Sequence, residues 1–203
     1  MDPICNAYKA IAQRSGLLPG ENVVIFGTGP LGLFSVQIAK IMGALNIVVV
    51  GLEEDVKVRF GVARQLGATE VVNGSAEDVV QRCQEICGGS DSIGLVVDCA
   101  GANICLKQAI EMVRCNGEIV RVGMGFKPVG FSINDISMKA VSIIGHMAYD
   151  ATSWRNALQL LAAGRIQVKP MITHRLGLSR WEEGFEAMAN KEAIKVILTY
   201  DFD

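Results

Sequence analysis

The feature that most constrains the fold is an apolar run that leads into three regularly spaced glycines and then into a helical pattern. Asn22–Phe26 is rich in β-branched residues, and Gly27, Gly29 and Gly32 follow it in G-x-G-x-x-G spacing. From Leu31 to Met42, apolar residues then recur at helical intervals. A strand, a glycine-rich turn and a helix in this order predict the first unit of a parallel sheet.

The same alternation of short apolar runs and helical patterns continues to about residue 150, which predicts an α/β fold: a doubly wound, parallel, six-stranded Rossmann sheet over residues 1–150. We expect the remaining strands at Ile47–Val50, Glu70–Val72, Gly94–Asp98, Glu118–Val122 and Val141–Ile144, and further helices at Val56–Leu66, Ala76–Ile86 and Ile104–Val113. The connection from Gly125 to Lys139 is expected to be mostly irregular.

After the sixth strand the alternation stops, and residues 151–203 form a C-terminal tail. We expect a helix at Trp154–Ala163, a short strand at Ile172–Leu176, a helix at Trp181–Ala189 and a last strand at Ala193–Tyr200. A segment of this size buries too little apolar surface to fold alone. It should therefore pack on the sheet domain or on a part of the protein that this chain lacks.

The glycine-rich turn is the candidate binding motif. The first glycine of such a turn permits a tight bend, the second lets backbone approach a pyrophosphate, and the third lets the helix pack close to the strand. The helix N-terminus offers free N–H groups to the phosphates, and proline is tolerated there because its missing N–H would be unpaired. The predicted dinucleotide contacts are Gly27, Thr28, Gly29, Pro30, Leu31 and Gly32.

Two alternatives to a dinucleotide site stay open at this motif. The glycines could serve only a tight strand-to-helix turn, although six strands in the right order argue against this reading. S-adenosylmethionine is a competing ligand, but its enzymes are expected to carry an acid just before the first glycine, where this chain has Phe26.

The acidic residue that usually accepts from the adenosine ribose is displaced in this sequence. It normally ends the second strand, about 20 residues past the motif, but here that strand is followed by Gly51, Leu52, Glu53, Glu54 and Asp55. We take Glu53 as the candidate for the ribose contact. A solvated turn is an equally weighted interpretation of this acidic run.

Composition excludes several classes of partner. The net charge is only −2, and Lys and Arg are scattered, which argues against nucleic acid or an anionic membrane. Leu31–Val50 is nearly free of charge, but Gly43 and Asn46 divide it into a helix and a strand. The start of the chain lacks the pattern of a secretory signal, so we expect a cytoplasmic protein.

The six cysteines show no C-x-x-C pair and no cluster with histidine, so free thiols and no metal site are expected. Cys83 and Cys87 share one helical face, but two ligands alone do not close a zinc site. His146 and His174 are the only histidines, and neither has a partner at metal spacing.

Several further motifs resemble the medium-chain, zinc-type alcohol dehydrogenases, in particular the sorbitol or polyol and threonine dehydrogenase branch. The resemblance spans essentially the whole chain and rests on DPICNA, LLPGENVVIFGTGPLG, ARQLGATEVVN, VVDCAG, GEIVRVGM, SIIGHMAY, LLAAGRI, ITHRL and AIKVILTY. It implies a C-terminal cofactor-binding part that lacks an N-terminal, GroES-like catalytic domain, on which the tail at 151–203 would pack. The catalytic zinc and its ligands would belong to that missing domain, and no residue of this chain is expected to be catalytic or to bind metal.

The resemblance also extends the list of cofactor contacts. Cys99, Ala100 and Gly101 would pass the adenosine side, Val122, Gly123 and Met124 would face the nicotinamide carboxamide with Gly145, His146 and Met147 opposite, and Lys195 would lie on the pyrophosphate. Core packing is the alternative role for these small and apolar residues. Gly51 departs from the family, where an Asp is usual, and this leaves NADP open. NAD is nevertheless the expected cofactor, because the acidic run at 53–55 would repel the extra phosphate of NADP more than Lys57 and Arg59 would attract it.

The expected function is therefore the NAD(P)-binding domain of a zinc-dependent oxidoreductase that passes hydride from a secondary alcohol or polyol to the nicotinamide. The isolated chain is expected to be inactive. The alternative is a non-enzymatic module that binds NAD(H) or serves assembly. The resemblance further implies a homodimer through Val141–Ile144, because exposed strand edges pair readily.

Overall fold

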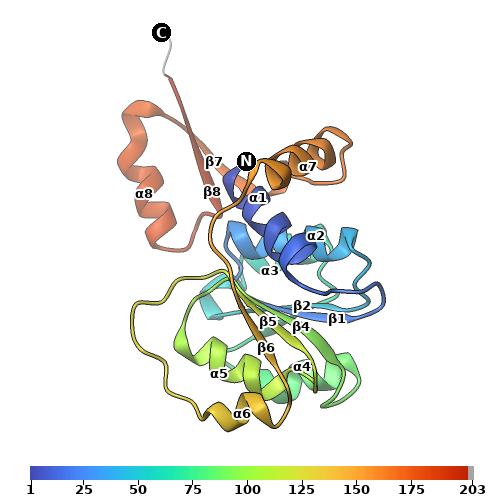
Figure 1. Cartoon of the computed structure of the whole chain (residues 1–203). Coiled ribbons are helices and arrows are strands. Elements are labelled where there is room, and N and C mark those ends of the chain that lie inside the picture. The colour runs from blue at the N-terminus through green and yellow to red at the C-terminus, as the bar shows by residue number, and fades with distance from the viewer. Residues whose placement is uncertain (201–203) are drawn as a thin grey trace.

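The computed structural model describes residues 1–200, and its centre is a six-stranded sheet (Figure 1). All neighbouring strands are parallel, and their order is β3-β2-β1-β4-β5-β6. The strands are β1 (Asn22–Phe26), β2 (Ile47–Gly51), β3 (Glu70–Asn73), β4 (Ile93–Asp98), β5 (Glu118–Arg121) and β6 (Ser142–Gly145). The predicted doubly wound sheet is confirmed, with each strand within one residue of its expected bounds.

The order of the strands reverses between β1 and β4. Val24 of β1 pairs with Val48 of β2 on one side and with Val96 of β4 on the other. In open α/β sheets, ligands bind in the crevice outside the carboxyl ends of the strands at such a reversal. The residues that follow Phe26 and Asp98 are therefore at the place where a ligand is expected.

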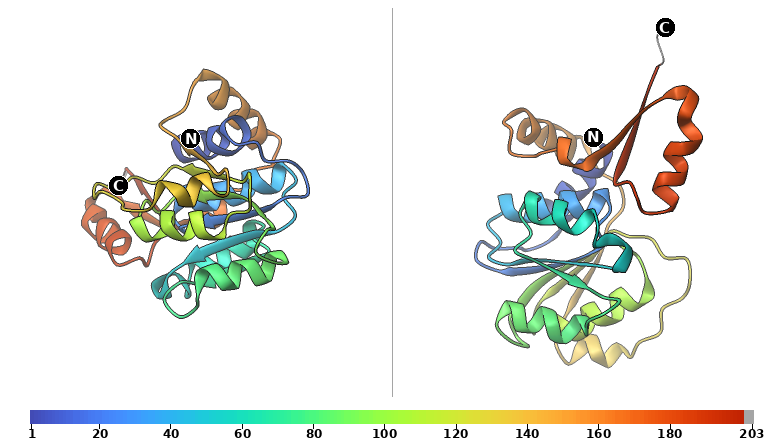
Figure 2. Two further views of the ribbon diagram at one scale, coloured as in Figure 1. Left: turned by 60° about the horizontal axis from the view of Figure 1, so that its bottom comes forward. Right: turned by 180° about the vertical axis from the view of Figure 1, so that it is seen from behind.

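Helices cover both faces of the sheet (Figures 1 and 2). One face carries α2 (Pro30–Ile41) and α3 (Arg59–Leu66), and the other carries α4 (Val79–Cys87) and α5 (Asn103–Met112). Val23 and Ile25 of β1 belong to the apolar cluster on the first face, and Val24 and Phe26 to the cluster on the second. Burial on both faces explains why the central strands β1, β2 and β4 are nearly continuous apolar runs rather than alternating ones.

An N-terminal helix, which the sequence analysis did not predict, packs beside α2. Helix α1 (Asp2–Tyr8) continues as a π-helical segment over Lys9–Arg14 and buries Ile4, Cys5 and Ile11. Helix α7 (Ala151–Ala162) lies against α1 and buries Ala157. The first helix of the tail is thus part of the body built on the sheet, which agrees with packing on the sheet domain.

Three helix starts lie three residues from their expected positions. Helix α7 starts at Ala151 rather than Trp154, because the Asp150 side chain caps it by accepting a hydrogen bond from the backbone N–H of Ser153 (2.8 Å). Helix α3 starts at Arg59 rather than Val56, because a 3₁₀ turn over Glu53–Asp55 intervenes. Helix α4 starts at Val79 rather than Ala76, because the Asp78 side chain caps it by accepting a hydrogen bond from the backbone N–H of Gln81 (3.0 Å). A short helix, α6 (Ile133–Ser137), interrupts the connection expected to be irregular.

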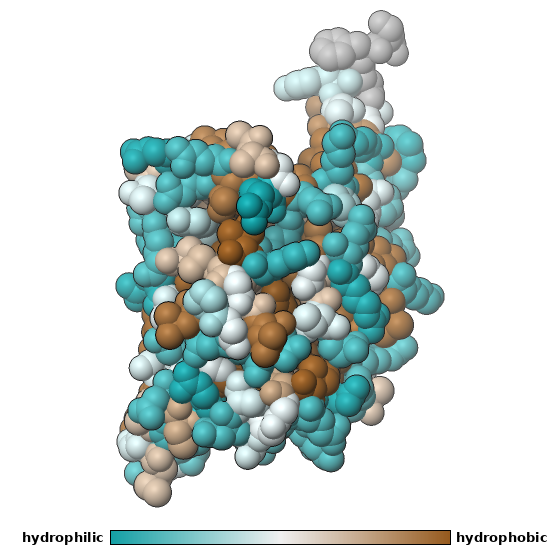
Figure 3. Space-filling view, turned by 90° about the vertical axis from the view of Figure 1, so that its right-hand side faces the viewer, coloured by the Kyte–Doolittle hydropathy of each residue, from teal (hydrophilic) through white to brown (hydrophobic). Residues whose placement is uncertain are grey.

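The rest of the tail forms a separate lobe. Strands β7 (Ile172–Gly177) and β8 (Lys195–Thr199) pair in parallel, and α8 (Trp181–Ala189) connects them after short 3₁₀ turns at Lys169–Met171 and Leu178–Arg180. The lobe projects from the body in Figures 1 and 2, and Figure 3 shows brown hydrophobic atoms on it. Phe185 is 67% exposed and Trp181 is 48% exposed, so the lobe has a partly uncovered apolar surface.

All six cysteines are free, as the sequence analysis expected, and Cys83 and Cys87 are buried in α4. In the part of the chain that the structure describes, no helix combines the length and apolar character needed to span a membrane. The stretch Leu31–Val50 is divided into α2 and β2 as expected.

Candidate functional site

The glycine-rich turn has the conformation that its spacing predicted. Gly27 has φ +101°, in the region that favours glycine, and its N–H donates to the carbonyl of Val50 (2.8 Å). A Cβ on Gly32 would overlap the carbonyl oxygen of Gly27. Gly27 therefore makes the bend and Gly32 lets α2 start directly against it.

The middle glycine faces open space. A Cβ on Gly29 would meet no atom within 4 Å, and its φ of −73° suits any residue. Gly29 is the N-cap of α2, Pro30 is in its first turn, and no side chain caps the helix. The first-turn N–H groups of α2, those of Leu31 and Gly32 among them, have no partner within the helix and remain available to an anion.

The loops after β4 and β5 cross each other so closely that only glycine fits. A Cβ on Gly101, which has φ +73°, would lie 2.5 Å from the carbonyl oxygen of Met124. A Cβ on Gly123 would overlap the N–H of Gly101. On the other side, the Ala100 N–H lies 3.3 Å from the Cβ position of Gly27. The structure thus brings together three of the predicted contact segments, those at 27–32, 99–101 and 122–124.

A buried ion pair holds this crossing in place. The fully buried Asp98 carboxylate accepts from the N–H groups of Ala100 (3.0 Å) and Gly101 (2.8 Å) and from the Arg121 guanidinium (2.8 Å). Arg121 also donates to the carbonyl of Gly101 (2.7 Å). Burial raises the pKa of Asp98, against the opposing effects of the Gly101 N–H and Arg121.

Sequence reasoning missed Asp98 and Arg121 as site residues. Both are charged residues at the ends of otherwise apolar strands, in VVDCAG and IVRVG, and they pair directly across β4 and β5. Charged residues at neighbouring strand ends are a signal that could have been used, because buried charges are nearly always paired.

Cys99 has a packing environment rather than that of a nucleophile. Its thiol lies 3.6 Å from the Ser35 hydroxyl, and burial raises its pKa to about 12, so the thiol stays protonated at neutral pH.

The end of β6 lies beside the end of β5 and against the N-terminal helix. The His146 N–H donates to the Arg121 carbonyl (3.1 Å), and Arg14 donates to the carbonyl of Gly145 (3.2 Å). The ring Nε2 of His146 lies 3.1 Å from the Asn6 Oδ1, while Nδ1 is buried without a partner among the described residues. Burial lowers the pKa of His146, and the nearby Lys9 and Arg14 cations lower it further. Met147 is 76% exposed and Met124 is 69% exposed at this edge.

Glu53 lies in the 3₁₀ turn after β2, displaced from the strand end as expected, and its carboxylate already has a partner. It accepts from the side-chain amide of Asn73 at the end of β3 (2.6 Å), and the Glu53 N–H donates to Ser75 (3.1 Å). The role of Glu53 as a ribose contact stays a prediction.

Lys195 is the predicted contact that lies apart from the others in the fold. It begins β8 in the C-terminal lobe, where it is exposed and lines a pocket with Trp181, Phe185 and Met188 of α8. Its carbonyl accepts from the Thr173 hydroxyl (3.3 Å). Its predicted contact with a pyrophosphate is untested by this geometry.

Comparison with known proteins agrees with the architecture. The family model described as zinc-binding dehydrogenase matches residues 30–163. The chain belongs to this family. A zinc-type alcohol dehydrogenase-like protein of Escherichia coli (strain K12), YdjL, which is described as uncharacterized, is 74% identical over 203 residues. That match covers 100% of the chain and 56% of YdjL. The expected resemblance to zinc-type dehydrogenases is confirmed.

Other relatives of this zinc-binding dehydrogenase chain have assigned activities. The sorbitol dehydrogenase of Halalkalibacterium halodurans is 31% identical, over 98% of this chain and 57% of the relative. The crystal structure of 2R,3R-butanediol dehydrogenase from Bacillus subtilis matches with a TM-score of 0.87 and 28% identity, over 98% of this chain and 56% of that one.

A zinc-binding dehydrogenase from Sinorhizobium meliloti, solved with NADP bound and described as putative, matches with a TM-score of 0.84 and 26% identity. That match covers 97% of this chain and 57% of that one. The chain thus spans a little over half the length of these relatives.

Proposed function

We propose that this chain is the nicotinamide-dinucleotide-binding part of a zinc-dependent oxidoreductase that passes hydride from a secondary alcohol or polyol to the nicotinamide. The observation that carries the proposal is the geometry of the turn at the sheet reversal, where Gly29 faces open space above an uncapped helix start. A pyrophosphate placed there meets free N–H groups and the positive end of the α2 dipole. Support for the substrate class comes from relatives that act on sorbitol and butanediol.

The described residues offer no zinc site. Across residues 1–200, no three or more His, Cys, Asp or Glu side chains gather in a way that could hold a metal ion. His146 contacts Asn6, and His174 lies beside the Thr173 hydroxyl at 3.1 Å. We propose that the zinc ligands and most of the substrate pocket belong to the roughly half of the relatives' length that this chain does not cover.

We propose a division at about residue 150, with the dinucleotide-binding unit at 1–150 and the tail at 151–203 completing an interface with a GroES-like catalytic domain. The exposed apolar residues of the C-terminal lobe support the proposed interface, because Leu178 and Trp181 are about half exposed and Phe185 is 67% exposed among the described residues. Six free cysteines are typical of a reducing compartment, so we propose the cytoplasm as the location.

NADH titration of the 203-residue chain tests the proposal. We expect measurable binding, seen as a change in nicotinamide fluorescence, and no oxidation of sorbitol or 2,3-butanediol with NAD, with or without added zinc. Absence of NADH and NADPH binding would overturn the proposal, and zinc-dependent turnover would overturn the assignment of chemistry to another part of the protein. If the protein extended by the missing part binds NADH but oxidises no alcohol, a non-enzymatic binding module is the better description.

A homodimer is the second part of the proposal. Strand β6 is at the edge of the sheet, and its Ser142, Ile143 and Gly145 are exposed. An uncovered edge of this kind presents unpaired backbone groups to a second copy. We therefore propose that two chains associate through β6 about a two-fold axis.

A further inference from the structure

Strand β2 ends at Gly51, which has no side chain, but neighbouring atoms already crowd the position that its Cβ would take. A Cβ on Gly51 would lie 2.5 Å from the Phe60 ring, 2.8 Å from the Thr28 methyl group and 2.9 Å from an oxygen of the Asp55 carboxylate. Thr28 is part of the glycine-rich turn. The Asp55 carboxylate thus reaches back from the following 3₁₀ turn to the tip of β2, beside that turn. No empty pocket for an extra phosphate is left by the missing side chain.

Two hydrogen bonds fix the Asp55 carboxylate in this place. One oxygen accepts from the Leu52 N–H (2.9 Å), and the other pairs with Arg59 (3.1 Å), one helical turn later. The side chains of Asp55 and Arg59 are 9% and 8% exposed. Arg59 also donates to the carbonyl of Ala193 (2.8 Å), ahead of β8. The pair is therefore a built and buried element rather than part of a solvated acidic run.

The pair retains unused hydrogen-bonding capacity. Among residues 1–200, the Arg59 Nε is buried without a partner. A carboxylate has four acceptor directions, and the two bonds to Asp55 use two of them. A ribose hydroxyl can donate to an open acceptor direction of the Asp55 carboxylate, while the buried Arg59 guanidinium holds that carboxylate from the protein side. A 2′-phosphate is an acceptor that carries nearly two negative charges, and the Asp55 carboxylate would repel it.

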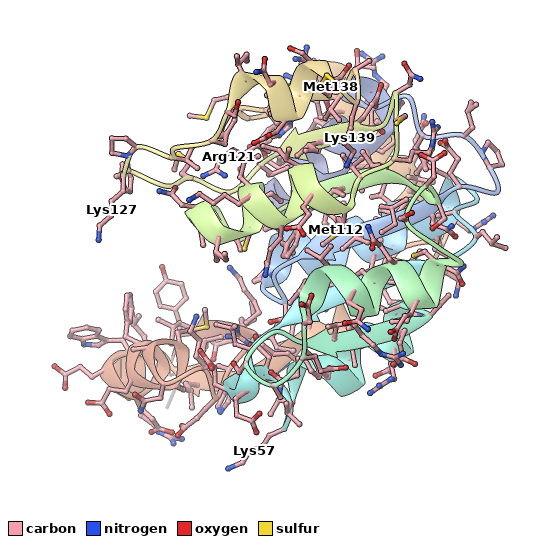
Figure 4. The ribbon with its side chains drawn as sticks, turned by 90° about the horizontal axis from the view of Figure 1, so that it is seen from below. Lys57, Met112, Arg121, Lys127, Met138 and Lys139 are labelled. Atoms are coloured by element: carbon pink, nitrogen blue, oxygen red, sulfur yellow. The ribbon has the colours of Figure 1, made fainter. Side chains whose placement is uncertain are left out.

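The other charged groups near the end of β2 are less suited to contact the adenosine ribose or an extra phosphate. Glu53 is exposed and its carboxylate is bonded to Asn73. Lys57 is exposed and points away from the molecule (Figure 4), so it does not offer a cation beside the turn.

We propose that Asp55, positioned by Arg59, is the acid that binds the adenosine ribose and makes the site prefer NAD over NADP. The inference rests on the proposed dinucleotide binding. It assigns to a residue in the turn after β2 the role that the strand tip usually supplies.

The test compares NADH and NADPH binding by the 203-residue chain and two variants. In the double variant Asp55→Asn/Arg59→Gln, the first change keeps the size of the side chain, the second replaces the guanidinium by a shorter neutral amide, and no unpaired buried charge is left. We expect the wild-type chain to bind NADH about 10- to 100-fold more tightly than NADPH. In the double variant, NADH binding should weaken about tenfold and the preference should approach one. The matched control Glu54→Gln changes an exposed acid of the same turn and should keep the wild-type preference.

The outcomes separate the inference from the proposed function. If the wild-type chain binds neither cofactor, the proposed function fails. The inference about Asp55 is wrong if the chain binds NADH but the double variant, with an unchanged circular dichroism spectrum, keeps the wild-type preference. It is also wrong if Glu54→Gln loses that preference. If the double variant does not fold, Asp55→Glu replaces it, because it keeps the charge and shifts the carboxylate by one methylene. Undiminished NADH affinity in that variant would equally overturn the inference.

Discussion

At the scale of single residues, Gly29 and Gly32 lack side chains for different reasons. Gly32 has no room for a Cβ because the Gly27 carbonyl occupies the space, whereas Gly29 has room that the protein itself does not fill. One glycine therefore serves the fold, and the other serves the proposed ligand.

Substitutions at these two glycines should separate stability from binding. Gly32→Ala is expected to lower the free energy of unfolding by about 3 kcal/mol, because α2 must move away from the turn. Gly29→Val should cost no more than about 1 kcal/mol, the scale of an N-cap change, yet weaken NADH binding at least about tenfold. Urea unfolding and NADH titration measure the two effects. Unweakened NADH binding by Gly29→Val would show that the pyrophosphate lies elsewhere.

His146 should make stability depend on pH. Burial, followed by the Lys9 and Arg14 cations, lowers its pKa in the folded chain below the ordinary 6.5, so the unfolded chain binds the proton more readily. The stability that this difference contributes is present above pH 6.5 and is lost as the pH falls below it. The unfolding temperature of the wild-type chain should therefore fall more steeply between pH 7 and pH 5 than that of the His146→Gln variant. If the unfolding temperatures of the two chains depend on pH in the same way, His146 is not the group responsible.

At the scale of elements, the loops after β4 and β5 form one unit because Asp98 and Arg121 connect them. Removing the guanidinium in Arg121→Met leaves the fully buried Asp98 with only its two backbone N–H partners. We expect a loss of about 3 kcal/mol in the free energy of unfolding, since an uncompensated buried charge is costly.

Acidification should partly rescue this variant, because a protonated Asp98 no longer needs a cation. The measurement is urea unfolding of Arg121→Met and of the wild-type chain at pH 7 and pH 5. If the variant's free energy of unfolding lies below that of the wild-type chain by the same amount at both pH values, the loss comes from packing of the Arg121 stem and not from its charge.

The helices and strands also show how much of the fold the sequence could predict. Strands β1, β2 and β4 were predictable because each is a short apolar run, rich in β-branched residues, that is buried along its length. Strands β3, β5 and β6 are shorter and partly exposed, and their place in the alternation of strands and helices predicted them. The orientation of Asp55 was not predictable, because Glu53, Glu54 and Asp55 are equivalent in a polar run and only the space above Gly51 selects one of them. Helix α1 and the π-helical segment after it have Ile4, Ala7 and Ile11 at helical spacing, a signal that was present in the sequence but was not used.

At the scale of the whole molecule, the proposed dimer depends on the edge strand β6. Replacing Ile143, which is 36% exposed, by lysine should convert the proposed dimer to a monomer, because edge lysines oppose pairing. Light scattering at micromolar concentration measures the mass. Leu45→Lys is the matched control, since Leu45 is 62% exposed on the connection before β2. A monomeric wild-type chain, or a dimeric Ile143→Lys chain, would contradict the proposal.

The strand order also has a consequence for synthesis of the protein. β1 pairs with β2 soon after both are made, but its other neighbour, β4, ends at Asp98, about 70 residues after Phe26. At roughly 5–20 residues per second, the β4-facing edge of β1 stays unpaired for about 4–14 s on the ribosome. The strand exposed during that interval, NVVIF, is almost entirely apolar. The nascent chain therefore depends on prompt arrival of β4, or on a chaperone, to keep this edge from pairing with another molecule.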